Sequence, residues 1–254
     1  MTQSRRRPFR VLAVVVVAAL ACLTFPSSAT AADPGLVLGY GFEQVAAGAV
    51  LDSSPSGLTG RLQGSPALSG RATSVTGHGK ALTFDATQRQ FIDAGSNPAL
   101  DVNQFTLAAW VRYLPKVHDD RWEVLEKAGA YWMNIRTDTR RLRVGGFFGG
   151  CTAVGNVWQF VDSKKALPAS TWVHVAGTYD GKALRVYING ALDNSLPVTG
   201  KTCVNTSPLG IGAKNRTATG VVEAYFDGRI DDLRVYTRAL SLNEIKAARA
   251  TALS

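Results

Sequence analysis

Short segments with alternating apolar residues recur along most of the chain. In the strongest of them, Phe105, Leu107 and Val111 occupy alternate positions. Successive side chains of a strand point to opposite faces of a sheet, so this pattern predicts β-strands with one face toward a core. Further strands are expected at 36–42, 60–63, 81–84, 90–93, 124–127, 131–136, 142–148, 171–179, 184–188 and 208–212.

Glycine-containing turns separate these segments. Asp180 and Gly181 lie between the segments 171–179 and 184–188. Asp-Gly is one of the residue pairs preferred in two-residue hairpin turns. The two segments are therefore predicted to pair as neighbouring antiparallel strands.

The stretch 226–245 is predicted to close the fold with a strand and a helix. If alternation is strict, Ile230, Asp232, Arg234 and Tyr236 share one face, and Asp231, Leu233 and Val235 share the other. Ser241 and Glu244 then form a capping-box pattern, which predicts the start of a short helix. Many short strands with a single helix predict an all-β sandwich or jelly roll.

The first 31 residues have the pattern of a signal peptide rather than of a folded element. Arginines at positions 5, 6, 7 and 10 precede an apolar run at 11–25, and Ala29 and Ala31 provide a cleavage pattern of small residues. We expect cleavage near Ala31, secretion, and a single domain over 32–254. An uncleaved membrane anchor is the alternative, and the choice between the general secretory and twin-arginine routes stays open.

The charge of the chain gives little indication of a nucleic-acid partner. Its 254 residues include 28 basic and 19 acidic ones, for a net charge of +9. Four of the basic residues lie in the predicted signal, so the mature chain has a mild excess without a basic run. We therefore expect no nucleic-acid partner, and no membrane span after signal removal.

Two cysteines, Cys151 and Cys203, remain after removal of the predicted signal. An even number of cysteines in an oxidising compartment predicts a disulfide. Free thiols or a metal site are the alternatives. A C-x-x-C spacing is lacking, which favours the disulfide.

Four segments together resemble a known family. They are 105–112 (FTLAAWVR), 172–181 (WVHVAGTYDG), 184–190 (LRVYING) and 226–245 (FDGRIDDLRVYTRALSLNEI). They are similar to the laminin-G-like jelly-roll domains of the concanavalin A-like lectin/glucanase superfamily. The resemblance implies an all-β fold: a two-sheet antiparallel jelly-roll sandwich with a short C-terminal helix. It also implies a concave face that often holds carbohydrate in relatives.

The same resemblance implies a structural calcium ion in many members. By position, Asp52 matches the acid of the family's turn motif, Asp232 matches the second acid of its I-D-D motif, and Glu43 follows the first strand. Pro55 interrupts the usual turn pattern in this chain. Asp231 in place of Asp232, or ion pairs with neighbouring arginines instead of calcium, are the alternatives.

Aromatic residues gather in the middle third of the chain, close to glycine pairs. Sugar rings stack on exposed aromatic side chains, while polar neighbours bind the hydroxyl groups. Burial in the core is the alternative, because strand alternation buries about half of such residues. The candidate ligand contacts are Trp122, Tyr131, Trp132, Phe148 and Trp158, with Arg121 as a polar partner.

No catalytic pattern stands out. The glucanase relatives use acids at E-x-D-x-E spacing on one strand face, and this triplet is lacking here. Glu123 and Glu126 have an odd spacing that predicts opposite faces of a strand, and the same holds for His174 and Tyr179. We therefore expect no enzyme but a lectin-like module that binds a glycan or cell-surface polysaccharide. A protein-binding or cell-surface scaffold is the alternative, and a hydrolase or lyase a weaker one.

Overall fold

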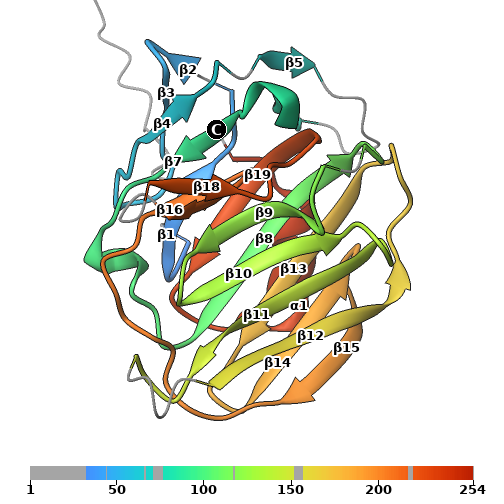
Figure 1. The fold of residues 1–254 in the computed structure, drawn as a ribbon. Helices are drawn as coiled ribbons and strands as arrows, with labels where there is room; N and C mark the ends of the chain where they lie inside the picture. Colours follow the sequence, from blue (N-terminus) through green and yellow to red (C-terminus); the bar gives the residue numbers. More distant parts are fainter. Residues whose placement is uncertain are drawn as a thin grey trace, which may run out of the picture. The chain divides into compact units, whose positions relative to one another are not determined.

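A computed structural model describes residues 33–43, 45–65, 67–70, 77–116, 118–151, 157–216 and 220–253. The predicted signal peptide, 1–31, lies outside the described residues. All strand pairs within the described part are antiparallel, and the sheets form an all-β sandwich with one C-terminal α-helix, as predicted (Figure 1).

One layer of the sandwich is an eight-stranded sheet. Its order is β15-β14-β13-β8-β19-β6-β5, and β1 pairs with the second half of β19. The bounds are β1 (Leu36–Tyr40), β5 (Leu68–Gly70), β6 (Lys80–Phe84), β8 (Phe105–Tyr113), β13 (Val173–Tyr179), β14 (Ala183–Ile188), β15 (Ala191–Pro197) and β19 (Gly228–Tyr236).

The other layer is a nine-stranded sheet in the order β12-β11-β10-β9-β16-β7-β4-β3-β2. Its bounds are β2 (Val45–Ala46), β3 (Ala49–Val50), β4 (Gly60–Gln63), β7 (Phe91–Asp93), β9 (Arg121–Lys127), β10 (Tyr131–Arg136), β11 (Arg141–Phe148), β12 (Val157–Ala166) and β16 (Leu209–Ile211). A separate hairpin consists of β17 (Lys214–Arg216) and β18 (Val221–Glu223). Two 3-10 turns, Ala86–Gln88 and Pro98–Leu100, complete the connections.

The main core lies between the two sheets. Strand alternation supplies it: Phe105, Leu107 and Val111 of β8 are fully buried in it, as predicted. The hairpin prediction is also confirmed, because β13 pairs with β14 with Tyr179 opposite Leu184. Burial of such side chains, at about 25 cal/mol per Å² of apolar surface, is the main term that holds the layers together.

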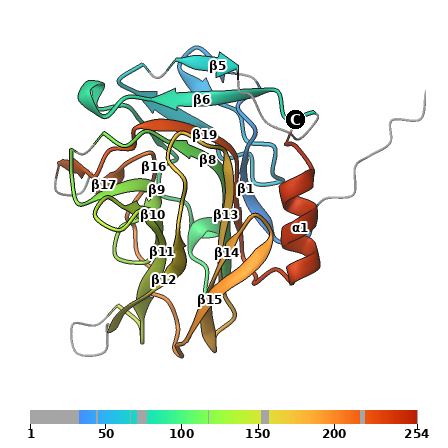
Figure 2. The same ribbon diagram turned by 90° about the vertical axis from the view of Figure 1, so that its right-hand side faces the viewer.

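The helix α1 (Leu242–Ala250) covers part of the outer face of the eight-stranded sheet (Figure 2). Ser241 and Glu244 form the predicted capping box, with hydrogen bonds of 2.8 and 3.3 Å. Ile245 packs with Ala108 and Tyr187, which face away from the main core. This face of the molecule is therefore partly occupied by the chain itself.

The predicted disulfide is confirmed. Cys151 and Cys203 are bonded, with Cα atoms 4.6 Å apart and a separation of 52 positions in sequence. The bond joins the chain that follows β11 to the segment that leads into β16.

The predicted alternation of the closing strand is wrong at its middle. A register irregularity between Asp231 and Arg234 interrupts the pairing of β19 with β8. Asp232 there has a backbone φ of 46°, a left-handed conformation that aspartate tolerates better than most residues. As a result Ile230 shares the core with Leu233, although the pattern predicted opposite faces.

Candidate functional site

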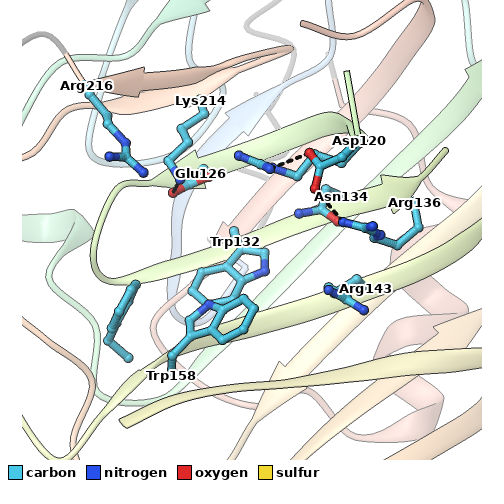
Figure 3. A pocket seen from close by; sticks show the side chains of 11 residues that line it. Asp120, Glu126, Trp132, Asn134, Arg136, Arg143, Trp158, Lys214 and Arg216 are labelled. Carbon is cyan, nitrogen blue, oxygen red and sulfur yellow. Dashed lines mark hydrogen bonds and ion pairs between the residues drawn. The ribbon is translucent and has the colours of Figure 1, made fainter. Parts of the chain in front are cut away.

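An opening on the outer face of the nine-stranded sheet is the candidate functional site. It is a cavity of about 310 Å³ over β9, β10, β11 and β12, with β17 beside it (Figure 3). Its volume is at the lower end of what small-ligand sites enclose.

Strand alternation places the residues of this cavity. In β10, Tyr131 and Met133 point into the core. Trp132, Asn134 and Arg136 occupy the alternate positions and line the cavity. The central strand therefore presents an aromatic, an amide and a guanidinium group in a row along its length.

Two tryptophans form one side of the cavity. The rings of Trp132 and Trp158 are stacked, with centroids 5.9 Å apart and planes at 27° (Figure 3). Phe147 meets Trp132 edge-on at 5.6 Å. Trp158 is 53% exposed, which is unusual for the largest apolar side chain. We call Trp132, Phe147 and Trp158 the aromatic ledge.

Gly145 makes room for this ledge. It lies opposite Trp132 in the pairing of β10 with β11. A Cβ atom at position 145 would overlap the indole of Trp132. The absence of a side chain therefore lets the ring lie flat on the sheet.

Ion pairs form the opposite side of the cavity. Asp120 bridges Arg121 and Arg136, at 2.6 and 2.7 Å. Arg143 makes a bidentate pair with Asp162, with hydrogen bonds of 2.7 and 2.8 Å. Such paired groups offer both donors and acceptors to a ligand hydroxyl, and bidentate geometry keeps them fixed.

The hairpin β17–β18 supplies a further wall beside β9. Lys214 approaches Glu126 to 3.3 Å and Glu223 to 3.6 Å. Arg216 also lies 3.6 Å from Glu223. The wall therefore continues the pattern of paired charges.

The prediction that Glu123 and Glu126 lie on opposite faces of their strand is wrong. Glu123 pairs with Asn134 and Glu126 with Trp132, two residues that share the outer face of β10. A bulge in the intervening part of β9 changes the parity, since it inserts one extra residue against the partner strand. Both glutamates therefore lie on the cavity side of the sheet.

These two carboxyl groups are held in a poorly solvated environment. Burial raises the pKa of Glu123 well above its usual value, and the neighbouring Glu126 adds to the effect. Burial also raises the pKa of Glu126, against the opposing influence of Lys214. Glu123 accepts hydrogen bonds from Arg121 at 3.2 Å and Asn134 at 3.3 Å and is fully buried, so only Glu126 lines the cavity.

Three of the predicted ligand residues come together at this site, and three do not. Trp132, Trp158 and Arg121 line the cavity. The prediction is wrong for Trp122, Tyr131 and Phe148, which are at most 2% exposed and belong to the main core. Each of these three occupies the inward parity of its strand, so a ligand on the outer face cannot reach it.

Several lining residues were not predicted. Asn134 and Arg136 could have been found, because they alternate with the apolar residues of β10. Lys214 and Arg216 gave no comparable signal, since the short hairpin that carries them has no apolar alternation.

Asp52, the first predicted calcium ligand, organises a turn. Its Oδ1 accepts hydrogen bonds from the amides of Gly39 and Ser54, at 2.8 and 2.9 Å. Its Oδ2 accepts from the Ser54 hydroxyl and the Leu58 amide, both at 2.7 Å. Donor hydrogens thus point at both oxygens, an arrangement that does not fit a cation ligand.

The other two predicted calcium ligands also hold hydrogen-bond donors. Glu43 accepts from the amide of Lys80 at 2.7 Å. Asp232 contacts the imidazole of His78 and accepts from the amide of Leu253 at 2.7 Å. In the part of the chain that the structure describes, no three His, Cys, Asp or Glu side chains are grouped to hold a metal ion. Calcium binding stays a prediction.

A family model matches residues 85–246, and its description is the concanavalin A-like lectin/glucanases superfamily. The chain belongs to this superfamily. The match confirms the resemblance found in the sequence and agrees with the antiparallel sandwich. No curated protein matches the chain significantly in sequence.

Solved structures of this superfamily fold include several binding domains. The binding domain of Paraclostridial Mosquitocidal Protein 1 is similar with a TM-score of 0.64 and 16% identity, over 85% of this chain and 52% of that domain. Domain 4 of AbnA, an extracellular arabinanase from Geobacillus stearothermophilus, was solved in complex with arabinotriose. Its TM-score is 0.56 at 18% identity, over 84% of this chain and 98% of that one.

The binding domain of botulinum neurotoxin DC, solved in complex with rat synaptotagmin II, is similar with a TM-score of 0.54 and 13% identity, over 85% of this chain and 51% of that one. The chain thus spans about half the length of the mosquitocidal-protein and botulinum-neurotoxin binding domains. At these identities the likeness shows the fold alone, and any argument about a ligand has to come from this protein's own residues. Among the described residues, no helix is both long and apolar enough to cross a membrane.

Proposed function

We propose that the protein is a secreted, non-catalytic carbohydrate-binding module whose sugar site is the cavity on the outer face of the nine-stranded sheet. The observation that carries the proposal is the aromatic ledge beside paired charged groups. A sugar ring has an apolar face, which stacks on an indole, and a rim of hydroxyl groups, which need donors and acceptors. Trp158 and the Arg136–Asp120 pair offer these two surfaces in one cavity.

Domain 4 of AbnA, solved with arabinotriose, supports a sugar ligand at the level of fold. The complex of the botulinum neurotoxin domain with synaptotagmin supports the alternative, a protein-binding scaffold. A scaffold would be expected to expose one contiguous apolar patch. The large exposed apolar residues of the described part lie on different segments of the chain: Leu51, Trp158, Leu192, Val204, Val221 and Leu242. Trp158 among them lines the cavity beside charged and polar groups. The sugar site is therefore the better supported function.

A glycoside hydrolase is a second candidate, because Glu123 and Glu126 share one face and both have raised pKa values. Hydrolysis needs two carboxyl groups that flank the scissile bond. Glu123 is fully buried beneath Arg121 and Asn134, so it cannot contact a sugar in this arrangement. The geometry therefore favours binding over cleavage.

A panel of immobilised glycans, screened with and without a calcium chelator, tests the proposal. We expect binding to a subset of the glycans, and no release of reducing ends from the polysaccharide that binds. Absence of binding in both conditions would favour the scaffold, and release of reducing ends would favour the hydrolase.

A further inference from the structure

A second cavity, of about 280 Å³, lies next to the one described above. It extends over the β9–β10 turn, at Ala128 and Gly129, and is bounded by Ser207 and Pro208. Lining residues that belong to both cavities show that the two are contiguous; these are Glu126, Phe147, Lys214 and Arg216. The described surface thus carries one groove with two compartments.

This groove runs along β10. Arg136, Asn134 and Trp132 lie at successive outward positions of the strand, which cover about 13 Å at 3.3 Å per residue. The groove then continues past Trp132 over the turn that begins at Ala128. Its length exceeds that of a single sugar ring, and Phe147 lies where the two compartments join.

The second compartment, bounded by Ser207 and Pro208, is formed by a segment that the rest of the fold holds in place. Lys127 is fully buried and its ammonium group donates to the carbonyl oxygens of Asn205 and Ser207, both at 2.7 Å. The disulfide of Cys203 holds the start of the same segment. A pre-formed compartment costs a ligand little ordering free energy.

The cations of the groove are already compensated. Each of the five that line it has a carboxylate within 3.6 Å: Arg121, Arg136, Arg143, Lys214 and Arg216. An anionic ligand would have to compete with these carboxylates, whereas hydroxyl groups can bind to donor and acceptor together. The pairing therefore favours an uncharged, polyhydroxylated ligand.

We infer that the two compartments bind consecutive units of one neutral polysaccharide chain. This inference rests on the proposed function and adds to it the chain length and the charge class of the ligand.

A chain-length series tests the inference. Neutral oligosaccharides of increasing length, prepared from the polysaccharide that binds in the glycan panel, are titrated by calorimetry. Affinity should rise on the order of tenfold between the disaccharide and the oligomer that reaches the second compartment, and then level off. An affinity that is the same for all lengths would overturn the inference while leaving carbohydrate binding intact. Absence of binding at every length would instead contradict the proposed function.

Two variants at neighbouring positions test whether the gain in affinity comes from the second compartment. Ser207→Gln enlarges a side chain of the second compartment, and Thr206→Gln makes the same change at an exposed position that lines neither compartment. Ser207→Gln should lower the affinity for the long oligomer to that for the disaccharide, and Thr206→Gln should match the unmodified protein. Equal affinities in both variants would overturn the assignment of the second compartment.

Polygalacturonate and salt test the charge class. Neutral oligomers should keep their affinity within about twofold between about 50 and about 300 mM salt, because an uncharged ligand makes no charge–charge attraction that salt could screen. Binding restricted to polygalacturonate, with a steep loss in salt, would overturn the assignment of a neutral ligand.

Discussion

Removal of the Trp158 indole is the most informative perturbation of the proposed site. Trp158 is 53% exposed, and its ring stacks on Trp132 at the edge of the cavity. Trp158→Ala removes the accessible part of the aromatic ledge while the core stays intact. We therefore expect a loss of affinity without a comparable loss of stability.

The magnitude follows from the exposed area. A tryptophan side chain buries at most about 250 Å², so roughly 130 Å² of Trp158 remains in solvent. A sugar ring covers one face of the indole, which is about half of that area. At 25 cal/mol per Å², the contact contributes about 1.6 kcal/mol, or a factor of about 15 in Kd.

Calorimetric titration with the oligosaccharide that binds best measures this factor. Leu192→Ala is the matched control, because Leu192 is also 53% exposed but lies on β15 of the other sheet and lines neither compartment. An affinity of Trp158→Ala within about twofold of that of the control would refute the stacking site.

Further predictions concern stability and its dependence on calcium. Glu123→Gln should gain stability relative to the unmodified protein as the pH rises above about 4, because the raised pKa of Glu123 means that its ionisation costs more in the folded state; a pH-independent difference in Tm would contradict this. Burial, with the cations of two nearby arginines, lowers the pKa of His174 to about 3, so the unfolded chain binds more protons between about pH 6.5 and about pH 3. The free energy of unfolding should therefore decrease as the pH is lowered through this window, by about 2 kcal/mol at about pH 5 in urea titrations. His174→Gln should remove that slope. Replacement of Cys151 and Cys203 by serine should cost about 4 kcal/mol, seen as a Tm lowered by about 10 °C, whereas an unchanged Tm would show that the bond contributes little. Chelation of calcium should leave Tm unchanged, because donor hydrogens occupy Asp52, and a fall of several degrees would instead support the calcium ion expected from the family.

Most of the framework could be predicted from local patterns. The alternation in β8, the Asp-Gly turn between β13 and β14, and the capping box of α1 each depend on a few neighbouring residues, and all three are present. The strands β12 and β15 were missed. Polar residues make up about half of each strand and interrupt the apolar positions, so these sequences lack the sustained apolar alternation on which the prediction relied.

Bulges account for the errors in side-chain direction. One extra residue in β9 brought Glu126 to the face of Glu123, and the irregularity in β19 brought Ile230 to the core. A bulge depends on pairing with a partner strand, which a single-strand pattern does not contain. Predictions that rested on parity across such a point were therefore wrong.

The aromatic cluster shows the same limit at the site. Tyr131 and Trp132 are adjacent in one strand, so only one of them can face the ligand. Composition alone selected both, whereas the alternation of β10 would have selected Trp132. The charged wall from β17 depends on how a short hairpin lies beside β9, and no local pattern encodes that arrangement.

The most direct test of the central claim is a crystal structure of the protein with its bound oligosaccharide. The account predicts a sugar ring against Trp158, with further rings past Phe147 toward Ser207. Density for the sugar on the face covered by α1, or on the loops away from β10, would contradict it.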